Sequence, residues 1–184
     1  MLPLPTWAIT ALAVVGFVSV AAFVLRVVRF VSRNFLRSTL SLKQYGAGAG
    51  YWAVVTGASD GIGKAYALAL AKAGFNVLLV SRTRSKLDAV AAEIAAKYPR
   101  VQTNVVAIDF AAARTADFDA LDKALRTTSV GVLVNNAGMS LEYPERFLDA
   151  DAQRQRDIVQ VNCAALTECT LRVLRAMIRN AHQG

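Results

Sequence analysis

A glycine-rich stretch is the part of this sequence whose residue types and spacing best fit a chemical task. It reads T-G-A-S-D-G-I-G from Thr56 to Gly63 and joins a short apolar segment to a helical pattern. Gly57 permits a backbone conformation closed to other residues, Gly61 leaves room for a ligand near the backbone, and Gly63 lets the helix pack close to the sheet. N–H groups in a first helical turn attract an anion. The stretch predicts a site for a dinucleotide diphosphate, although a plain tight turn uses the same glycines.

Arg82 lies about 20 residues beyond this stretch, at the end of the second expected strand, and follows Ser81. A carboxylate here would bind the ribose 2′-hydroxyl of NAD. Neither residue is acidic, and the guanidinium of Arg82 offers two parallel donors to a phosphate. The pair therefore predicts NADP over NAD, and the alternative is a surface arginine at a strand end.

Three further polar positions follow strands or interrupt an apolar helix. Asp109 ends the third expected strand, where its carboxylate can accept a hydrogen bond from an amine such as that of adenine, or simply form a turn. The sequence N-N-A-G at residues 135–138 ends the fourth strand, and its small residues let a ligand approach the backbone. Asn162 lies in an apolar stretch of helix and needs hydrogen-bond partners if it is buried.

Strands and helices alternate after residue 50, which predicts an α/β fold with a doubly wound, Rossmann-like parallel sheet. The expected strands are 51–56, 75–81, 101–109 and 130–135, and the expected helices are 61–73, 85–98, 116–127 and 151–180. In such a sheet strands one and four lie side by side where the strand order reverses. Both glycine-bearing strand ends should therefore face one crevice.

An apolar segment without charged residues precedes this domain, from Trp7 to Leu25. At about 1.5 Å per residue, a helix of this length nearly spans a hydrocarbon core of about 30 Å. Basic residues follow the segment and none precedes it, which favours an uncleaved transmembrane helix over a signal peptide. The positive-inside rule then places the following domain in the cytosol.

The charge distribution points to a membrane and argues against nucleic acid as a partner. The net charge is +8, and residues 1–43 hold five basic residues and no acidic one. We expect Arg26 to Lys43 to continue the helix along an anionic lipid surface, or else to form a solvated basic linker. The sequence Y-G-A-G-A-G at residues 45–50 separates an anchor region, 1–44, from the Rossmann domain, 45–184.

The cysteines predict neither a disulfide nor a metal site. Cys163 and Cys169 lie six residues apart on an expected helix and point to different faces. Both are expected to be small, buried, apolar side chains.

These motifs together resemble the short-chain dehydrogenase/reductase superfamily over residues 51–184, because the family has the same motifs in the same order. The resemblance implies that Asn162 is catalytic and holds a water in the proton relay. It also implies that Asp109 contacts adenine and that the backbone near Asn136 forms the wall beside the cofactor ribose. The implied cofactor-binding residues are Gly57, Ser59, Asp60, Gly61, Ile62, Gly63, Ser81, Arg82, Asp109, Asn136, Ala137 and Gly138.

A narrower resemblance rests on G-A-S-D-G-I-G-K from Gly57, L-V-S-R-T from Leu79, and Lys86-Leu87. With the anchor, these are similar to microsomal very-long-chain 3-oxoacyl-CoA reductases and to their 17β-hydroxysteroid dehydrogenase type 12-like relatives. The resemblance implies NADPH-dependent reduction of 3-oxoacyl-CoA to 3-hydroxyacyl-CoA in fatty-acid elongation at the endoplasmic reticulum. It also implies an acyl-CoA substrate, membrane lipid and other elongation enzymes as partners. The alternatives are a steroid or retinoid dehydrogenase and a non-catalytic, membrane-tethered nucleotide-binding protein.

One departure concerns the family's catalytic serine and its Tyr-x-x-x-Lys, which follow the asparagine after a further strand. This sequence ends at Gly184, and none of its five tyrosines has a lysine four residues later. We therefore expect the cofactor half of a reductase, present as a fragment or a truncated gene model. Alone it should reduce no ketone, and a soluble piece of residues 45–184 should aggregate through its exposed edge strand.

Overall fold

The computed structural model describes residues 5–36 and 41–181. The chain divides into two units, Met1–Leu40 and Ser41–Gly184. In the first unit, helix α1 (Thr6–Val31) continues into a π-helical segment, Ser32–Leu36, and buries no side chain. By length and composition, Thr6–Leu36 is a candidate membrane span. The helix therefore extends past the first arginines as expected, while residues 37–40 of the basic segment lie outside the described residues.

A four-stranded sheet with the order β3-β2-β1-β4 forms the centre of the second unit. All neighbouring strands are parallel. The side chains of the two central strands are mostly buried, as expected of strands covered on both faces, whereas those of the two edge strands are mostly half-buried or exposed. Their bounds are β1 Trp52–Thr56, β2 Asn76–Ser81, β3 Thr103–Ala107 and β4 Val130–Val134. The predicted doubly wound fold, with strands one and four side by side, is confirmed.

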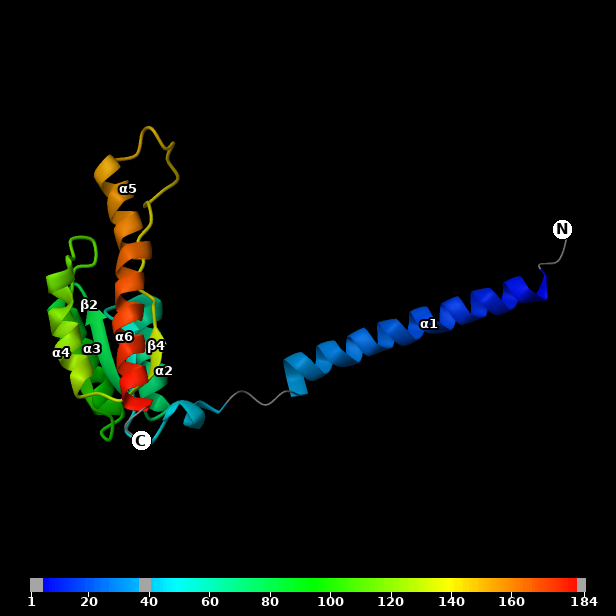
Figure 1. Ribbon diagram of the computed structural model, residues 1–184, viewed down its shortest axis with the longest axis horizontal. Coiled ribbons are helices and arrows are strands. Elements are labelled where there is room, and N and C mark those ends of the chain that lie inside the picture. The colour runs from blue at the N-terminus through cyan, green and yellow to red at the C-terminus, as the bar shows by residue number, and fades with distance from the viewer. Residues whose placement is uncertain (1–4, 37–40, 182–184) are drawn as a thin grey trace. The chain divides into compact units, whose positions relative to one another are not determined.

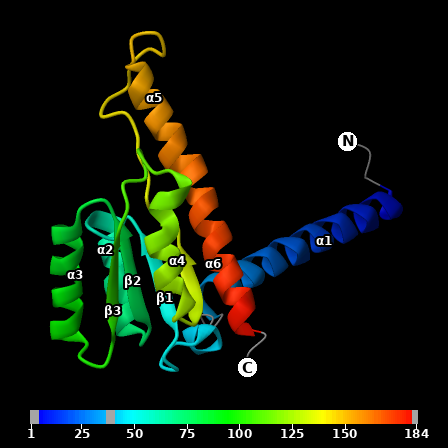
Figure 2. The same cartoon turned by 60° about the vertical axis from the view of Figure 1, so that its left-hand side comes forward.

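Helices cover both faces of this sheet (Figures 1 and 2). Helices α2 (Gly61–Lys72) and α3 (Arg84–Lys97) pack on one face. The other face carries α4 (Asp119–Arg126), which follows a 3₁₀ turn, and the C-terminal helix. That helix was predicted as one α-helix but has three consecutive parts, α5 Ala152–Val159, the π-helical η4 Gln160–Ala165 and α6 Leu166–Ala181. The interruption contains Asn162, whose side chain bonds to the loop after β4.

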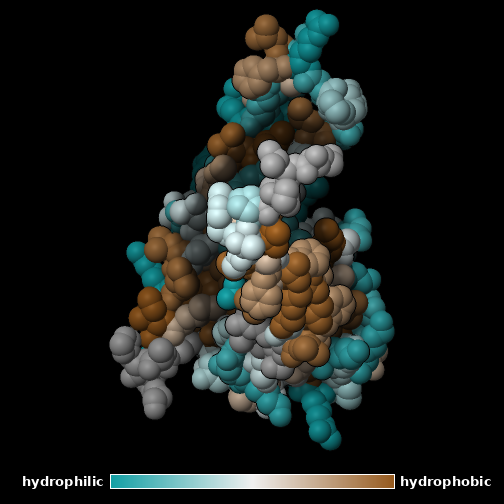
Figure 3. All heavy atoms as spheres, turned by 90° about the vertical axis from the view of Figure 1, so that its right-hand side faces the viewer, coloured by the Kyte–Doolittle hydropathy of each residue, from teal (hydrophilic) through white to brown (hydrophobic). Residues whose placement is uncertain are grey.

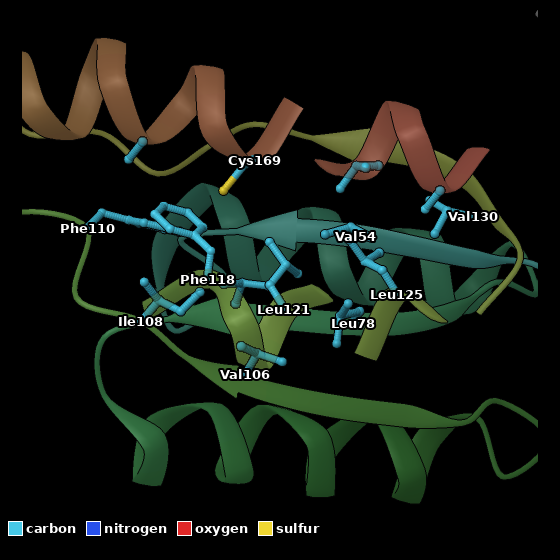
Figure 4. Packing of buried hydrophobic residues seen from close by; sticks show 14 of the residues in the cluster. Val54, Leu78, Val106, Ile108, Phe110, Phe118, Leu121, Leu125, Val130 and Cys169 are labelled. Carbon is cyan, nitrogen blue, oxygen red and sulfur yellow. The ribbon is translucent and has the colours of Figure 1, made fainter. Parts of the chain in front are cut away.

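A hydrophobic core lies on each face of the sheet. Figure 4 shows the one beneath α4 and α6, where Val54 and Leu78 meet Phe118 and Leu121. Cys169 is buried there, and burial raises the pKa of its thiol to about 12, so it stays neutral and apolar.

The predicted burial of Cys163 is wrong, because this side chain is exposed. Six residues make about one and two-thirds helical turns, so Cys163 and Cys169 cannot both face the core.

Ion pairs join neighbouring helices on each face. The Arg172 guanidinium of α6 binds the carboxylates of Asp122 in α4 and Glu168, and it lies 5.1 Å from the centre of the Phe118 ring. On the opposite face, Glu93 of α3 accepts hydrogen bonds from Lys64 of α2 and from Lys97, and these bonds lower its pKa to about 2. These contacts fix the helices whose ends surround the carboxyl edge of the sheet.

The segment before β1 is fastened to the opposite, amino-terminal edge of the sheet. It contains a 3₁₀ turn, Leu42–Tyr45, and the N–H of Gly48 donates to the carbonyl of Gly74 at 3.1 Å. A Cβ at Gly131 would lie 1.9 Å from the carbonyl oxygen of Tyr45, so the chain crosses β4 at a position where only glycine fits. The carboxyl edge of the sheet therefore remains clear of this segment.

Candidate functional site

A crevice with a volume of about 540 Å³ lies at the carboxyl ends of the strands. The loop after each of the four strands contributes to its lining, as expected for a ligand site at the switch point of a doubly wound sheet. Nine predicted residues line it, namely Gly57, Ser59, Asp60, Ser81, Arg82, Asp109, Asn136, Ala137 and Gly138. The structure thus brings together side chains from positions far apart in the sequence.

The buried hydroxyl of Thr56 joins the ends of β1 and β4. Its oxygen accepts hydrogen bonds from the backbone N–H groups of Asn136 and Ala137, both at 3.0 Å. In return, Nδ2 of Asn136 donates to the carbonyl oxygens of Thr56 at 3.1 Å and of Gly57 at 3.3 Å. The side chain of Asn136 therefore ties the ends of these two neighbouring strands together. Thr56 itself was missed, although a hydroxyl at the end of a buried strand must find partners.

The three glycines of the turn have different surroundings. Gly57 has φ +65°, and a Cβ there would lie 2.8 Å from Nδ2 of Asn136. A Cβ at Gly63 would lie 2.1 Å from the carbonyl oxygen of Gly57, so only glycine lets α2 begin this close to the turn. At Gly61, φ is +55° and nothing lies within 4 Å of a Cβ position. Gly61 is therefore required by its backbone conformation and not by close packing.

The first turn of α2 differs in one respect from the simple anion cradle predicted from sequence. Asp60 caps the helix, and its Oδ1 accepts the N–H of Gly61 at 2.7 Å. Gly61, Ile62 and Gly63 are not among the lining residues, and the side chain of Ile62 is exposed. Of the four residues 60–63, only Asp60 therefore lines the crevice, and the two glycines set the course of the backbone next to it.

Ser81, Arg82 and Asp109 lie together at the β2 and β3 side of the crevice. The hydroxyls of Ser59 and Ser81 are 3.0 Å apart and connect the glycine turn to the end of β2. Arg82 is exposed, so its guanidinium is accessible to an anion. Asp109 is also exposed, and its Oδ1 accepts the N–H of Ala111 at 3.2 Å, so it both forms a turn and lines the crevice.

Asn162 supports the wall of the crevice and is not one of its lining residues. Its Oδ1 accepts the N–H of Met139 at 2.9 Å, and its Nδ2 donates to the carbonyl of Met139 at 2.8 Å. This reciprocal pair fixes the chain one residue beyond Gly138. Asn135 has a different role, because its Nδ2 donates to the hydroxyl of Thr170 in α6 at 2.8 Å.

Several lining residues gave no sequence signal. Ser140, Leu141 and Glu142 extend the wall beyond Met139, and Arg154 reaches it from α5. Nη2 of Arg154 donates to the carbonyl of Ser140 at 3.1 Å. A charged residue on a solvated helix is common, so only the loop conformation reveals this contact. The part of the chain that the structure describes holds no group of three or more His, Cys, Asp or Glu side chains suited to a metal ion.

Comparison with known proteins identifies relatives of this chain. Residues 51–184 match the family model described as short chain dehydrogenase. The very-long-chain 3-oxoacyl-CoA reductase of Coprinopsis cinerea is 44% identical over 176 residues, which cover 96% of this chain and 51% of the relative. The corresponding reductase of Schizosaccharomyces pombe is 41% identical over 176 residues, covering 96% of this chain and 51% of that protein. The chain thus spans about half the length of the curated relatives it matches.

A solved structure agrees with these sequence matches. The short-chain dehydrogenase from Sphingobium yanoikuyae in complex with NADPH is 31% identical, with a TM-score of 0.62 over 71% of this chain and 50% of that chain. The resemblance predicted from the glycine turn, Asp109, N-N-A-G and Asn162 is confirmed at the level of the family. With a parallel sheet, flanking helices and a family match over residues 51–184, this chain belongs to the short-chain dehydrogenase family.

Proposed function

We propose that this chain is the cofactor-binding part of a membrane-anchored, NADPH-dependent reductase that acts on very-long-chain 3-oxoacyl-CoA. This proposal rests on one observation: residues of the glycine turn, Arg82 and residues of the N-N-A-G segment line the same crevice. The relatives that match nearly the whole chain are named very-long-chain 3-oxoacyl-CoA reductases, which supports this substrate class.

The residues around the crevice fit NADPH in chemistry and in space. Bound NADPH would supply the hydride that reduces the 3-keto carbon. Gly57 and Ser59, which line the crevice in the turn that leads into α2, suit its diphosphate, and Arg82 suits its 2′-phosphate. Asp109 would accept a hydrogen bond from the adenine amine, and Asn136 to Gly138 would line the ribose.

Asn162 has a positioning role in this proposal, because both polar atoms of its side chain bond to Met139. We further propose that it helps hold the water of a proton relay. The 184-residue chain by itself should reduce no ketone, since none of its tyrosines carries the lysine that would lower a proton donor's pKa.

We propose that α1 crosses the endoplasmic reticulum membrane once and leaves the Rossmann unit in the cytosol. None of its side chains is buried within the protein, and the charged residues in it and just after it, Arg26, Arg29 and Arg33, all lie at its carboxyl-terminal end. The proposed partners are acyl-CoA, membrane lipid and the other enzymes of fatty-acid elongation.

Replacing Arg82 with aspartate should remove the preference for NADPH. Loss of a charge-assisted contact with the 2′-phosphate costs about 1.5–3 kcal/mol, or about 10- to 150-fold in kcat/KM for NADPH. The measurement compares kcat/KM for NADPH and NADH in the full-length protein encoded by the transcript. Arg84→Asp is the matched control, because it makes the same charge change two residues away, outside the lining of the crevice. An unchanged NADPH preference in Arg82→Asp would refute this assignment.

Asn162→Ala should lower kcat/KM for the 3-oxoacyl-CoA about tenfold or more, because it leaves both backbone groups of Met139 without a partner. Because Asn162 positions the wall beside the reacting groups, most of the loss should appear in kcat. Cys163→Ala is the control, since this neighbouring side chain is exposed and its removal should change neither parameter. A change confined to thermal stability, with normal kcat, would show that Asn162 is only structural.

The orientation of the anchor is tested with a glycosylation sequence placed before Thr6 or after Ala181. In protein synthesised with microsomes, only the amino-terminal sequence should be modified, because the basic residues remain on the cytosolic side. Modification of the carboxyl-terminal sequence would contradict the orientation. A mature chain that lacks residues 1–25 would contradict an uncleaved anchor.

A further inference from the structure

A second hollow, with a volume of about 720 Å³, lies between α5 and the loop that precedes it. We call it the loop–helix groove. Its apolar lining consists of Leu141, Phe147, Ala150, Ala152, Ile158 and Val159. In Figures 1 and 2, α5 and this loop extend together beyond the carboxyl edge of the sheet, and Figure 3 shows apolar side chains at that end of the molecule.

Hydrogen bonds hold the two walls of the groove together. Nε2 of Gln155 in α5 donates to the carbonyl of Phe147 in the loop at 2.8 Å. Arg154 bonds the start of the loop at Ser140. The Asp151 carboxylate caps α5 by accepting the N–H groups of Gln153 and Arg154, at 3.2 and 3.0 Å. The shape of the groove is therefore set by hydrogen bonds between the loop and α5.

The side chains in the groove suit an apolar ligand. Phe147 is 79% exposed and Val159 is 60% exposed, so covering them with apolar groups is favourable. Ala152 and Val159 lie seven positions apart and share one face of α5. The groove's charged residues include Glu145 and Arg156, which have opposite signs and do not favour an anionic lipid head group.

The connection with the crevice indicates what occupies the groove. Leu141 lines both spaces, so the groove adjoins the crevice three residues beyond Gly138 and two beyond Met139. A substrate whose keto group reacts beside that wall needs a place for its apolar remainder. We propose that the loop–helix groove binds the acyl chain of the 3-oxoacyl thioester, an inference that rests on the proposed function.

The test is the dependence of kcat/KM on acyl-chain length in the full-length protein. Phe147→Glu and Val159→Glu each place a charge where the chain would lie. They should lower kcat/KM for 3-oxohexadecanoyl-CoA about tenfold or more, because a charge is costly to bury against an apolar chain. With acetoacetyl-CoA, which has no long chain, kcat/KM should stay within about twofold of the wild-type value.

Leu148→Glu is the matched control, because Leu148 is 93% exposed, lies next to Phe147 and does not line the groove. It should leave kcat/KM unchanged for both substrates. Equal losses for long and short chains, or no loss in either groove variant, would overturn the proposal.

Photo-crosslinking tests the groove independently of turnover and of the proposed function. Palmitoyl-CoA with a diazirine at the end of its acyl chain should label residues 141–159 of the wild-type protein, and Val159→Glu should reduce this labelling about tenfold. Labelling confined to other segments would overturn the groove assignment. Labelling of the groove in a protein that reduces neither thioester would retain the groove and reject the proposed reductase activity.

Discussion

The crevice depends on the hydrogen bonds between Thr56 and Asn136, which join the ends of β1 and β4. One buried hydroxyl accepts two backbone N–H groups after β4, and the Asn136 amide returns two bonds to the end of β1. The position of the Asn136 side chain also explains why residues 57 and 63 are glycines. A Cβ at Gly57 or Gly63 would lie only 2.8 or 2.5 Å from Nδ2 of Asn136. The glycine turn and the N-N-A-G segment are therefore two halves of one interaction. Each of these backbone N–H groups, if buried without an acceptor, would lower the free energy of unfolding by about 1–3 kcal/mol.

Beyond Asn136, further hydrogen bonds support the next residues of the crevice wall. Asn162 fixes Met139, and Arg154 then fixes Ser140. Both supporting side chains come from the same interrupted helix, whose π-helical part contains Asn162. The helix is held in turn against α4 by the ion pair of Arg172 with Asp122. The wall at Met139 and Ser140 and the adjoining loop–helix groove thus depend on one helix.

The features that could be predicted well from the sequence follow from the alternation of strands with helices and from the strand order of the sheet. The glycine turn and the N-N-A-G segment were expected to face one crevice because strands one and four lie side by side where the strand order reverses, and residues of both line it. The interruption of the C-terminal helix was missed, because the apolar period around Asn162 does not reveal a π turn. Thr56 was missed because a threonine at a strand end is common, and only its partners show its role. The exposure of Cys163 depends on helix phase, which the burial tendency of cysteine does not give.

The affinity for NADPH after Thr56→Val in the full-length protein measures whether the Thr56–Asn136 hydrogen bonds shape the cofactor crevice. Valine keeps the shape of threonine but leaves the N–H groups of Asn136 and Ala137 without an acceptor, so Kd should rise about tenfold or more. Thr128→Val is the control, because Thr128 is also buried but lies before β4, at the opposite edge of the sheet. It should leave the Kd unchanged at a temperature where both variants are folded. An unchanged Kd in folded Thr56→Val, measured by calorimetric titration, would show that NADPH binding does not depend on these hydrogen bonds.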